Sequence, residues 1–355
     1  MKIGIFDPYL DDLGGGEKYM MTIAQILSKN NIVTLFWDHP DDLIPLTERF
    51  ALDLSRVKTE KNIFSSNISF TKRLLESRKY DAIIILSDGS IPLLASKKLF
   101  VHIQQPLRQF EKGTLKNMIK LSRVTKFFCN SEYTKSFISN SFGLKTEILY
   151  PPVDLKPKNL KKENIVLHVG RFRVKNVGVD DYKKQRVMVG SFKEMVDKGL
   201  KNWKFVLAVS VKKEDEKEFN KLKESVKKYP IEFLINKSND ELWDIYSKSK
   251  IYWHASGYGE DLEKFPEYAE HFGISTVEAM GAGCVPVVIN AGGQKEIVEN
   301  NVNGLTWDNL DELKLHTIKL IEDEKLLLKL SDEARKTSHK YNMVNFEKKL
   351  LEIIK

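Results

Sequence analysis

The feature that most constrains the fold of this chain is a repeated alternation of short apolar runs with longer amphipathic stretches. In the first 150 residues, runs rich in β-branched and aromatic side chains are separated by segments with helical periodicity. This alternation is typical of a parallel sheet covered by helices on both faces, as in doubly wound α/β folds. The runs are KIGIF (2–6), VTLF (33–36), AIIIL (82–86), LFVHI (99–103), KFFCN (126–130) and TEILY (146–150).

A second set of apolar runs follows a segment that has no apolar periodicity. Residues 151–164 are rich in proline and lysine, which is typical of a linker, so we expect the first domain to end near Tyr150. In open α/β sheets, ligands bind beyond the carboxyl ends of the strands, so the loops after the strands of both domains are expected to line a cleft. The second set comprises IVLHVG (165–170), KFVLAVS (204–210), IEFLI (231–235), IYWHAS (251–256) and VPVVIN (285–290).

The charge balance narrows the range of partners without choosing among them. Lys and Arg outnumber Asp and Glu by 57 to 49, a net charge of +8, which suits phosphate-bearing ligands, anionic membrane surfaces or nucleic acid. We expect no nucleic-acid partner, because no aromatic-rich basic strand or recognition helix accompanies the charge. No apolar run reaches the roughly 20 residues of a membrane-spanning helix. With only Cys129 and Cys284 and no evident export signal, a reduced, cytoplasmic setting is expected.

Three consecutive glycines follow the first predicted strand. Gly14, Gly15 and Gly16 lead into a helix that is expected to start near Glu17. Glycines let backbone N–H groups approach a phosphate or a sugar closely, and the N-terminus of a helix favours an anion. The motif does not match the G-x-G-x-x-G dinucleotide fingerprint. A tight turn between a strand and a helix explains the same residues equally well.

A basic cluster follows the first strand of the second domain. Arg171 comes directly after a glycine at the predicted strand end, and Lys183 and Lys184 are expected to open the next helix. Cationic side chains at the mouth of a cleft can neutralise a diphosphate, which is the leaving group of a glycosyl transfer from a nucleotide sugar. For the two lysines alone, a solvated basic loop is the simpler interpretation, because lysine is abundant throughout the chain.

The segment EHFGISTVEAMGAGCVPVVINAGGQKEIV (270–298) is the most specific motif in the chain. Seven residues separate Glu270 from Glu278, so in a continuous helix the two acids would lie about 12 Å apart along the axis. They are therefore expected to hold two ends of an extended ligand, with Glu278 in the helix and Glu270 in the loop before it. Backbone N–H groups at the helix start offer a phosphate site, formed by Phe272, Gly273, Ile274 and Ser275, and a turn at Gly292 and Gly293 follows.

These motifs together closely resemble the retaining glycosyltransferases of family 4. The resemblance covers nearly the whole chain and implies the GT-B fold, an α/β architecture of two doubly wound Rossmann-like domains facing each other across a cleft. An acceptor domain would span 1–152 and a nucleotide-sugar donor domain 153–337, with a C-terminal helix over about 338–355 packing back on the first domain. The matching motifs are GGGE (14–17), VHIQQP (101–106), NSEYTK (130–135), YPPVD (150–154), HVGRF (168–172), KKQ (183–185), the paired acids, GGQKEIV (292–298) and NGLTW (303–307).

The resemblance also implies a role for each candidate residue. Arg171 with Lys183 or Lys184 would neutralise the diphosphate, Glu270 would hold hydroxyls of the donor sugar, and Glu278 would bind the ribose hydroxyls. His102 would lie beside the transferred sugar, although a histidine packed at a strand end has the same pattern. The implied catalytic residues are Arg171, Lys183, Glu270 and His102, and the implied donor-binding residues are Gly15, Gly16, Lys184, Phe272, Gly273, Ile274, Ser275, Glu278, Gly292 and Gly293.

The implied reaction is the retaining transfer of a sugar, with mannose as one candidate, from a UDP- or GDP-linked donor to a glycan or a lipid-linked acceptor. No cofactor and no metal are expected, because nothing resembles a D-x-D metal motif, and the acidic pair Asp180–Asp181 lies among lysines. The same fold with epimerase, phosphorylase or hydrolase chemistry is the first alternative. A non-catalytic two-domain receptor for a sugar or a nucleotide is the second.

One amphipathic segment suggests a membrane contact. In FEKGTLKNMIKLSRVTKFF (110–128), basic residues outnumber acidic ones and are interleaved with Leu115, Met118, Ile119 and Leu121. Such a segment can bind an anionic membrane surface peripherally. It can equally be a solvated helix whose apolar stripe faces the core.

Overall fold

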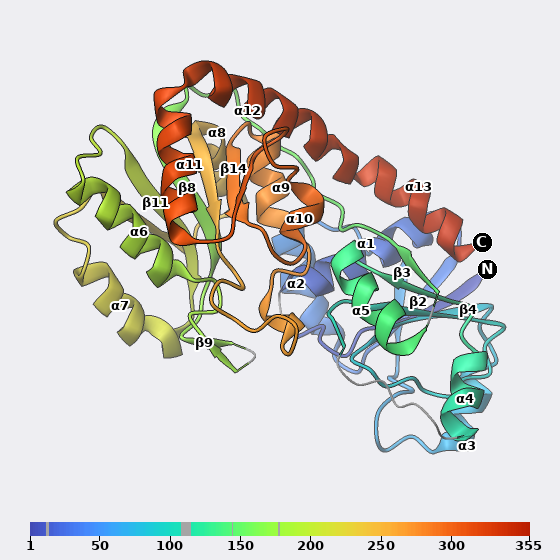
Figure 1. Ribbon diagram of the computed structural model, residues 1–355. Coiled ribbons are helices and arrows are strands. Elements are labelled where there is room, and N and C mark those ends of the chain that lie inside the picture. The colour runs from blue at the N-terminus through green and yellow to red at the C-terminus, as the bar shows by residue number, and fades with distance from the viewer. Residues whose placement is uncertain (12–13, 108–114, 144, 177) are drawn as a thin grey trace. The chain divides into compact units, whose positions relative to one another are not determined.

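The computed structural model describes residues 1–355 except 12–13, 108–114, 144 and 177. The chain forms two compact units, one of Met1–Pro152 with Val344–Lys355 and the other of Val153–Met343. Each unit has a parallel sheet with helices packed against it (Figure 1). Since the central strands of both sheets are nearly all buried, their near-continuous apolar runs correspond to strands covered on both faces.

The sheet of the first unit has seven parallel strands in the order β3-β2-β1-β4-β5-β6-β7. The strands are β1 (Lys2–Phe6), β2 (Ile32–Phe36), β3 (Val57–Glu60), β4 (Ala82–Ser87), β5 (Lys98–Ile103), β6 (Lys126–Cys129) and β7 (Thr146–Ile148). The helices are α1 (Gly15–Ser28), η1 (Pro40–Asp42), α2 (Leu43–Phe50), α3 (Phe70–Ser77), α4 (Leu115–Ser122), α5 (Glu132–Phe142) and α13 (Met343–Ile354).

The last helix, α13, packs on the first unit although the second unit lies between them in the sequence. Phe346 meets the ring of Tyr19 edge-on at 5.4 Å between ring centroids. Ion pairs join Lys29 to Glu347 at 2.9 Å and Lys349 to Glu147 at 3.1 Å. The helix starts at Met343 rather than near 338, because α12 ends at Ser338 and a short 3-10 turn follows it.

The sheet of the second unit has six parallel strands in the order β12-β11-β8-β13-β14-β15. The strands are β8 (Glu163–Phe172), β11 (Lys204–Val211), β12 (Ile231–Ile235), β13 (Ser249–His254), β14 (Val285–Ile289) and β15 (Leu305–Trp307), with an antiparallel hairpin of β9 (Lys175–Asn176) and β10 (Val179–Asp180). The helices are α6 (Gln185–Asp197), η2 (Lys213–Asp215), α7 (Glu216–Glu224), α8 (Asn239–Lys248), η3 (Pro266–Tyr268), α9 (Ile274–Gly281), α10 (Gln294–Ile297), α11 (Leu310–Glu322), α12 (Glu324–Ser338) and η4 (His339–Tyr341).

Alternate residues of the central strands of this sheet enter different hydrophobic clusters. On one face Val166 packs with residues of α6, α7 and α11, and on the other Ile165 and Leu167 pack with residues of α8 and α9. Successive side chains of any strand point to opposite faces of the sheet, and here the side chains on both faces are apolar. Helices therefore pack on both faces of the sheet and fix the position of its carboxyl edge, where the candidate site lies.

Three local expectations need correction. Helix α1 begins at Gly15 rather than near Glu17, because Gly14 is its N-cap and donates its backbone N–H to Glu17 Oε2 at 2.8 Å. Lys183 and Lys184 do not open a helix, because α6 begins at Gln185. Asp180 belongs to the short strand β10 and not to a loop.

Candidate active site

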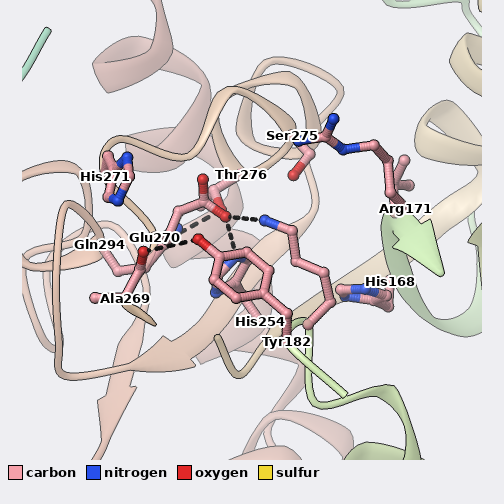
Figure 2. A network of polar contacts seen from close by, with 12 residues as sticks. His168, Arg171, Tyr182, His254, Ala269, Glu270, His271, Ser275, Thr276 and Gln294 are labelled. Atoms are coloured by element: carbon pink, nitrogen blue, oxygen red, sulfur yellow. Dashed lines mark hydrogen bonds and ion pairs between the residues drawn. The ribbon is translucent and has the colours of Figure 1, made fainter. Parts of the chain in front are cut away.

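The candidate site lies at the carboxyl edge of the second unit's sheet. Arg171 is the penultimate residue of β8, His254 is the last residue of β13, and Glu270 lies in the loop between η3 and α9. Figure 2 shows Arg171, His254 and Glu270 coming from different elements of the unit. Lys183, in the segment before α6, donates to Glu270 Oε2. This is the position at which open α/β sheets place their ligands.

Glu270 is the centre of a compact charged network. Its Oε2 accepts a hydrogen bond from Lys183 Nζ at 2.5 Å and another from His254 Nε2 at 2.9 Å. Burial alone would raise the pKa of Glu270, but the Lys183 ammonium and the His254 imidazole outweigh it and hold the pKa well below its usual range. The group is therefore a carboxylate at every physiological pH, and it neutralises Lys183.

Two buried histidines of the network are neutral and have defined tautomers. Burial lowers the pKa of His168 to about 3 and also lowers that of His254. His168 Nδ1 lies 3.0 Å from the carbonyl oxygen of Trp253, which only accepts, so Nδ1 carries the proton and Nε2 accepts from the Gln185 side chain at 3.3 Å. His254 donates from Nε2 to Glu270, which leaves a lone pair on its Nδ1.

The three candidate cations have different partners. The Arg171 side chain is exposed and makes no ion pair with any residue that the structure describes. Lys183 pairs with Glu270, whereas Lys184 is nearly buried and pairs with Glu260. Lys184 also has left-handed backbone geometry, with φ of 55°, as the N-cap of α6. Lys183 is thus the lysine that the structure brings to Glu270, and Lys184 points to a different acid.

Glycines brace the loop that carries Glu270. The backbone N–H of Gly293 donates to the carbonyl oxygen of Glu270 at 2.7 Å. A Cβ added at Gly293 would lie 2.4 Å from the carbonyl oxygen of His271, and one at Gly292 equally close to that of Glu270. Gly273, the N-cap of α9, has a φ of 116°, which favours glycine. The turn at 292–293 therefore fixes the loop backbone by close approach.

The start of α9 presents the remaining candidate residues. Phe272 is buried against the edge of Tyr341, while Ile274 and Ser275 begin the helix. Tyr252 donates its hydroxyl to Ser275 Oγ at 2.8 Å. The backbone N–H groups at the start of this helix can bind an anion.

Glu278 is held apart from Glu270 by the geometry of the motif. It lies inside α9, while Glu270 is in the loop before the helix. The Tyr246 hydroxyl donates to Glu278 Oε2 at 2.9 Å. Each of the two acids therefore has its own hydrogen-bond partners in the described structure.

The candidate residues of the first unit lie at the carboxyl edge of its own sheet. Gly15 and Gly16 form the first turn of α1, and a Cβ at Gly16 would lie 2.4 Å from the Gln104 side chain. His102, in β5, is fully buried and stacked on Tyr19 and Phe128, with centroids at 4.5 and 4.8 Å. Burial lowers its pKa to about 3, so the ring is neutral, and its Nε2 has no hydrogen-bond partner among the described residues.

Sequence reasoning missed several residues of the network. His168 and Gln185 belong to the motifs HVGRF and KKQ but were given no role, and His254 and Tyr182 did not stand out, because they lie within an apolar run and a lysine-rich segment. A polar residue that ends a buried strand at the carboxyl edge, as His254 does in IYWHAS, is the signal that could have found it. Over the residues that the structure describes, no cluster of His, Cys, Asp and Glu could hold a metal ion.

Solved structures of other proteins share this fold. The chain superposes on HepE of Anabaena in complex with UDP and glucose, with a TM-score of 0.70, 18% identity and coverage of 100% of this chain and 99% of that one. It superposes on sucrose-phosphate synthase of Thermosynechococcus elongatus with a TM-score of 0.67, 14% identity and coverage of 100% and 98%. Both have the GT-B glycosyltransferase fold, and so has this chain.

The family follows from the sequence of the second unit. Residues 154–337 match the model of the glycosyl transferases group 1, so the chain belongs to this family and is a glycosyltransferase. A GDP-Man:Man(3)GlcNAc(2)-PP-Dol alpha-1,2-mannosyltransferase of Dictyostelium discoideum is 23% identical over 85% of this chain and 56% of its own length.

Two further relatives match smaller parts of this chain. The Homo sapiens mannosyltransferase of the same name is 27% identical over 61% of this chain and 46% of its own length. An uncharacterised glycosyltransferase of Methanocaldococcus jannaschii is 25% identical over 76% of this chain and 74% of its own length. The chain therefore spans about half the length of the curated mannosyltransferases that it matches.

Proposed function

We propose that this protein is a retaining, metal-independent hexosyltransferase that moves mannose from GDP-mannose to a glycan or a lipid-linked acceptor. The observation that carries the proposal is the pair of cations at the carboxyl edge of the second sheet, where exposed Arg171 has no ion-pair partner among the described residues and Lys183 is held by Glu270. A diphosphate is the ligand that two such cations beside a helix N-terminus fit best.

The chemistry of the site supports transfer rather than simple binding. As the bond between the sugar and the diphosphate breaks, negative charge develops on the leaving oxygen, and preorganised cations stabilise that charge most strongly in the transition state. Arg171, Lys183 and the first turn of α9 would supply this stabilisation. Glu270 would then hold hydroxyls of the sugar and Glu278 those of the ribose. A receptor that only binds has no need to neutralise a departing group.

The names of the relatives support mannose as the sugar and GDP as the carrier. The same relatives act on a lipid-linked glycan, which supports an acceptor of that class. HepE binds UDP-glucose, so a UDP-sugar is the second candidate donor. For retention, we propose that the acceptor attacks from the face that the diphosphate leaves, without a carboxylate nucleophile.

A donor panel tests this proposal. The protein is titrated with GDP, UDP and ADP in a thermal-shift assay, since a nucleotide that binds the folded chain raises the melting temperature according to its affinity. GDP is expected to give the largest shift, and GDP-mannose is then expected to be consumed in the presence of a mannose-terminated acceptor. NMR of the product gives the anomeric configuration. A preference for UDP with no response to GDP would reject the proposed donor, and an inverted product would reject retention.

We also propose that the first unit contacts an anionic membrane surface through α4. The side chains of Leu115, Met118 and Ile119 are 74%, 63% and 47% exposed, while Leu121 is partly buried against the core. The apolar stripe of this helix thus does not face the core as a whole. Residues 110–114 of the segment lie outside the described residues. Among the helices that the structure describes, none is long and apolar enough to span a membrane.

A further inference from the structure

His254 is a buried residue of the network to which neither the motifs nor the relatives assign a role. It is the last residue of β13 and only 1% exposed. Its Nε2 lies 2.9 Å from Glu270 Oε2. A carboxylate is only an acceptor, so the imidazole is the donor in this hydrogen bond. The strand therefore delivers a donor group to Glu270 from a rigid element.

Glu270 needs such a partner, because it lies in a loop and secondary structure does not fix its side chain. Its backbone is held on both sides, by Gly293 N–H at the carbonyl of Glu270 and by the Tyr182 hydroxyl at the carbonyl of Ala269, 3.1 Å away. Among the described residues, the hydrogen bonds to the side chain reach only Oε2, which accepts from both Lys183 and His254. Its other oxygen, Oε1, makes no hydrogen bond to any residue that the structure describes.

The two partners of Oε2 differ in mobility. Lys183 is a long, flexible side chain that precedes α6, and a diphosphate would compete with Glu270 for its ammonium group. His254 is buried at the end of a central strand, and its ring is packed near His168, with centroids 6.4 Å apart. When Lys183 turns to a diphosphate, His254 is the partner that stays.

We propose that His254 is a positioning residue for sugar transfer: it anchors Oε2 of Glu270 so that Oε1 is presented to a hydroxyl of the donor sugar. This inference rests on the proposed function, in which Glu270 holds the sugar. Lys183 and His254 then have separate tasks. The lysine leaves Glu270 when the donor binds, whereas the histidine keeps the orientation of the carboxylate while the charge and shape of the sugar change.

The test compares three substitutions at position 254. In H254Q the side-chain amide can place a donor where Nε2 lies, in H254N the donor is nearer to the position of Nδ1, and H254F keeps a planar ring without a donor. For each variant, steady-state kinetics give kcat and KM for the sugar donor. Calorimetry gives the dissociation constant of the nucleoside diphosphate, and thermal unfolding reports stability.

We expect H254F and H254N to lower kcat by about 10- to 100-fold, the usual effect of losing a hydrogen bond to a charged group. Affinity for the nucleoside diphosphate should change by less than about twofold, because the phosphates and the ribose have other partners. H254Q should recover most of the lost turnover. If H254F does not fold, the comparison of H254Q with H254N decides by itself.

Several results would overturn the inference. An H254F enzyme with wild-type kcat, or H254N more active than H254Q, would show that the donor at Nε2 is not needed. Equal loss of turnover and of nucleotide affinity in all three variants would indicate a purely structural role. Wild-type protein that transfers no sugar from any donor would reject the proposed function and this inference with it, whereas an active wild type matched by H254F rejects the inference alone.

Discussion

At the scale of single residues, the cations of the site are separated by their partners. Arg171 has no counter-ion among the described residues, Lys183 pairs with the central carboxylate, and Lys184 pairs with Glu260 away from it. Arg171→Ala and Lys183→Ala are therefore expected to lower kcat by about 100- to 1000-fold, the usual effect of removing a group that stabilises developing charge.

Lys184→Ala is the matched comparison for these two variants, since it removes the same charge one residue away. We expect a loss of about tenfold or less, together with a lower melting temperature, because its nearly buried ion pair with Glu260 is broken. Steady-state kinetics and thermal unfolding of the three variants give the order. A larger kinetic effect in Lys184→Ala than in Lys183→Ala would assign the diphosphate to Lys184.

The paired acids are expected to separate nucleotide binding from turnover. Glu278→Gln should weaken the binding of both the free nucleoside diphosphate and the intact donor, by about 1.5–3 kcal/mol for a lost hydrogen bond to a charged group. Glu270→Gln should leave the affinity for the diphosphate nearly unchanged and lower turnover, since its contacts are to the group that changes during the reaction. Calorimetric titration beside kinetics makes the comparison. The opposite pattern would reverse the orientation of the donor along the motif.

The raised pKa of Asp7 leads us to expect that the stability of the first unit depends on pH. Burial raises its pKa to about 7, its Oδ1 accepts from Tyr9 N–H at 3.0 Å, and its Oδ2 has no partner among the described residues. A carboxyl group whose pKa is higher in the folded chain binds a proton there between the unfolded value, about 4, and about 7. Its contribution to stability is therefore present at low pH and lost as the pH rises through that window.

The substitution Asp7→Asn removes this titration. Between pH 5 and pH 8 the wild-type free energy of unfolding should fall by more than that of Asp7→Asn, by on the order of 2–3 kcal/mol. Urea unfolding at both pH values measures the free energy of unfolding. The change between the two pH values is taken within each protein, so that any pH-independent effect of the new amide cancels. Parallel pH profiles for the two proteins would mean that Asp7 is ionised in the folded state at neutral pH.

At the scale of elements, the sequence predicted the strands that have a continuous apolar run, including the partly exposed β12 and the three-residue β7, and missed β3 and β15, which have no such run. Ten expected runs coincide with strands from β1 to β14, within one or two residues at most ends, and an eleventh, TEILY, corresponds to β7. The missed strand β3 has alternating exposed and half-buried residues, and β15 is three residues long. Such segments have too few apolar positions to stand out from a loop.

In the site, the sequence likewise predicted residues that belong to local motifs but not the contacts between residues that are distant in the sequence. Arg171, Glu270 and Glu278 could be singled out, because the motifs place them at the end of a strand and around the start of a helix. The choice between Lys183 and Lys184 depends on the left-handed backbone at Lys184, which a sequence of two lysines does not encode visibly. His254 meets Glu270 across sixteen residues and two elements, and only the folded sheet shows that contact.

Helix α4 carries the prediction at this scale. If its exposed apolar residues enter an anionic bilayer surface, the double variant Met118→Glu/Ile119→Glu should float with anionic vesicles much less than the wild type, because it adds negative charge and removes apolar area. Leu328→Glu, at an exposed position of α12, is the matched control and should float like the wild type. Equal flotation with neutral and anionic vesicles, insensitive to salt, would count against the membrane contact.

At the scale of the whole molecule, the positive charge of the chain bears on the proposed neutralisation of a departing diphosphate. The chain has an excess of eight positive charges and places two cations at the site. The acidic pair Asp180–Asp181 serves another purpose, because Asp181 accepts from the backbone N–H groups of Gln185 and Arg186, both at 3.0 Å, and thereby caps α6. The carboxylate of Asp181 is thus hydrogen-bonded to the N-terminus of α6, where a negative charge is favourable.

Side-chain cations and helix N-termini can stabilise the same charge that a divalent ion would, so we expect turnover without added metal. The initial rate of donor consumption is measured after dialysis against excess EDTA and again after magnesium or manganese is restored in excess of the chelator. The rate should change by less than about twofold. Lys183→Ala, assayed in the same way, shows whether a metal can substitute for the missing charge. A wild-type rate that collapses in EDTA and returns with magnesium would mean that Arg171 and Lys183 do not neutralise the leaving group by themselves.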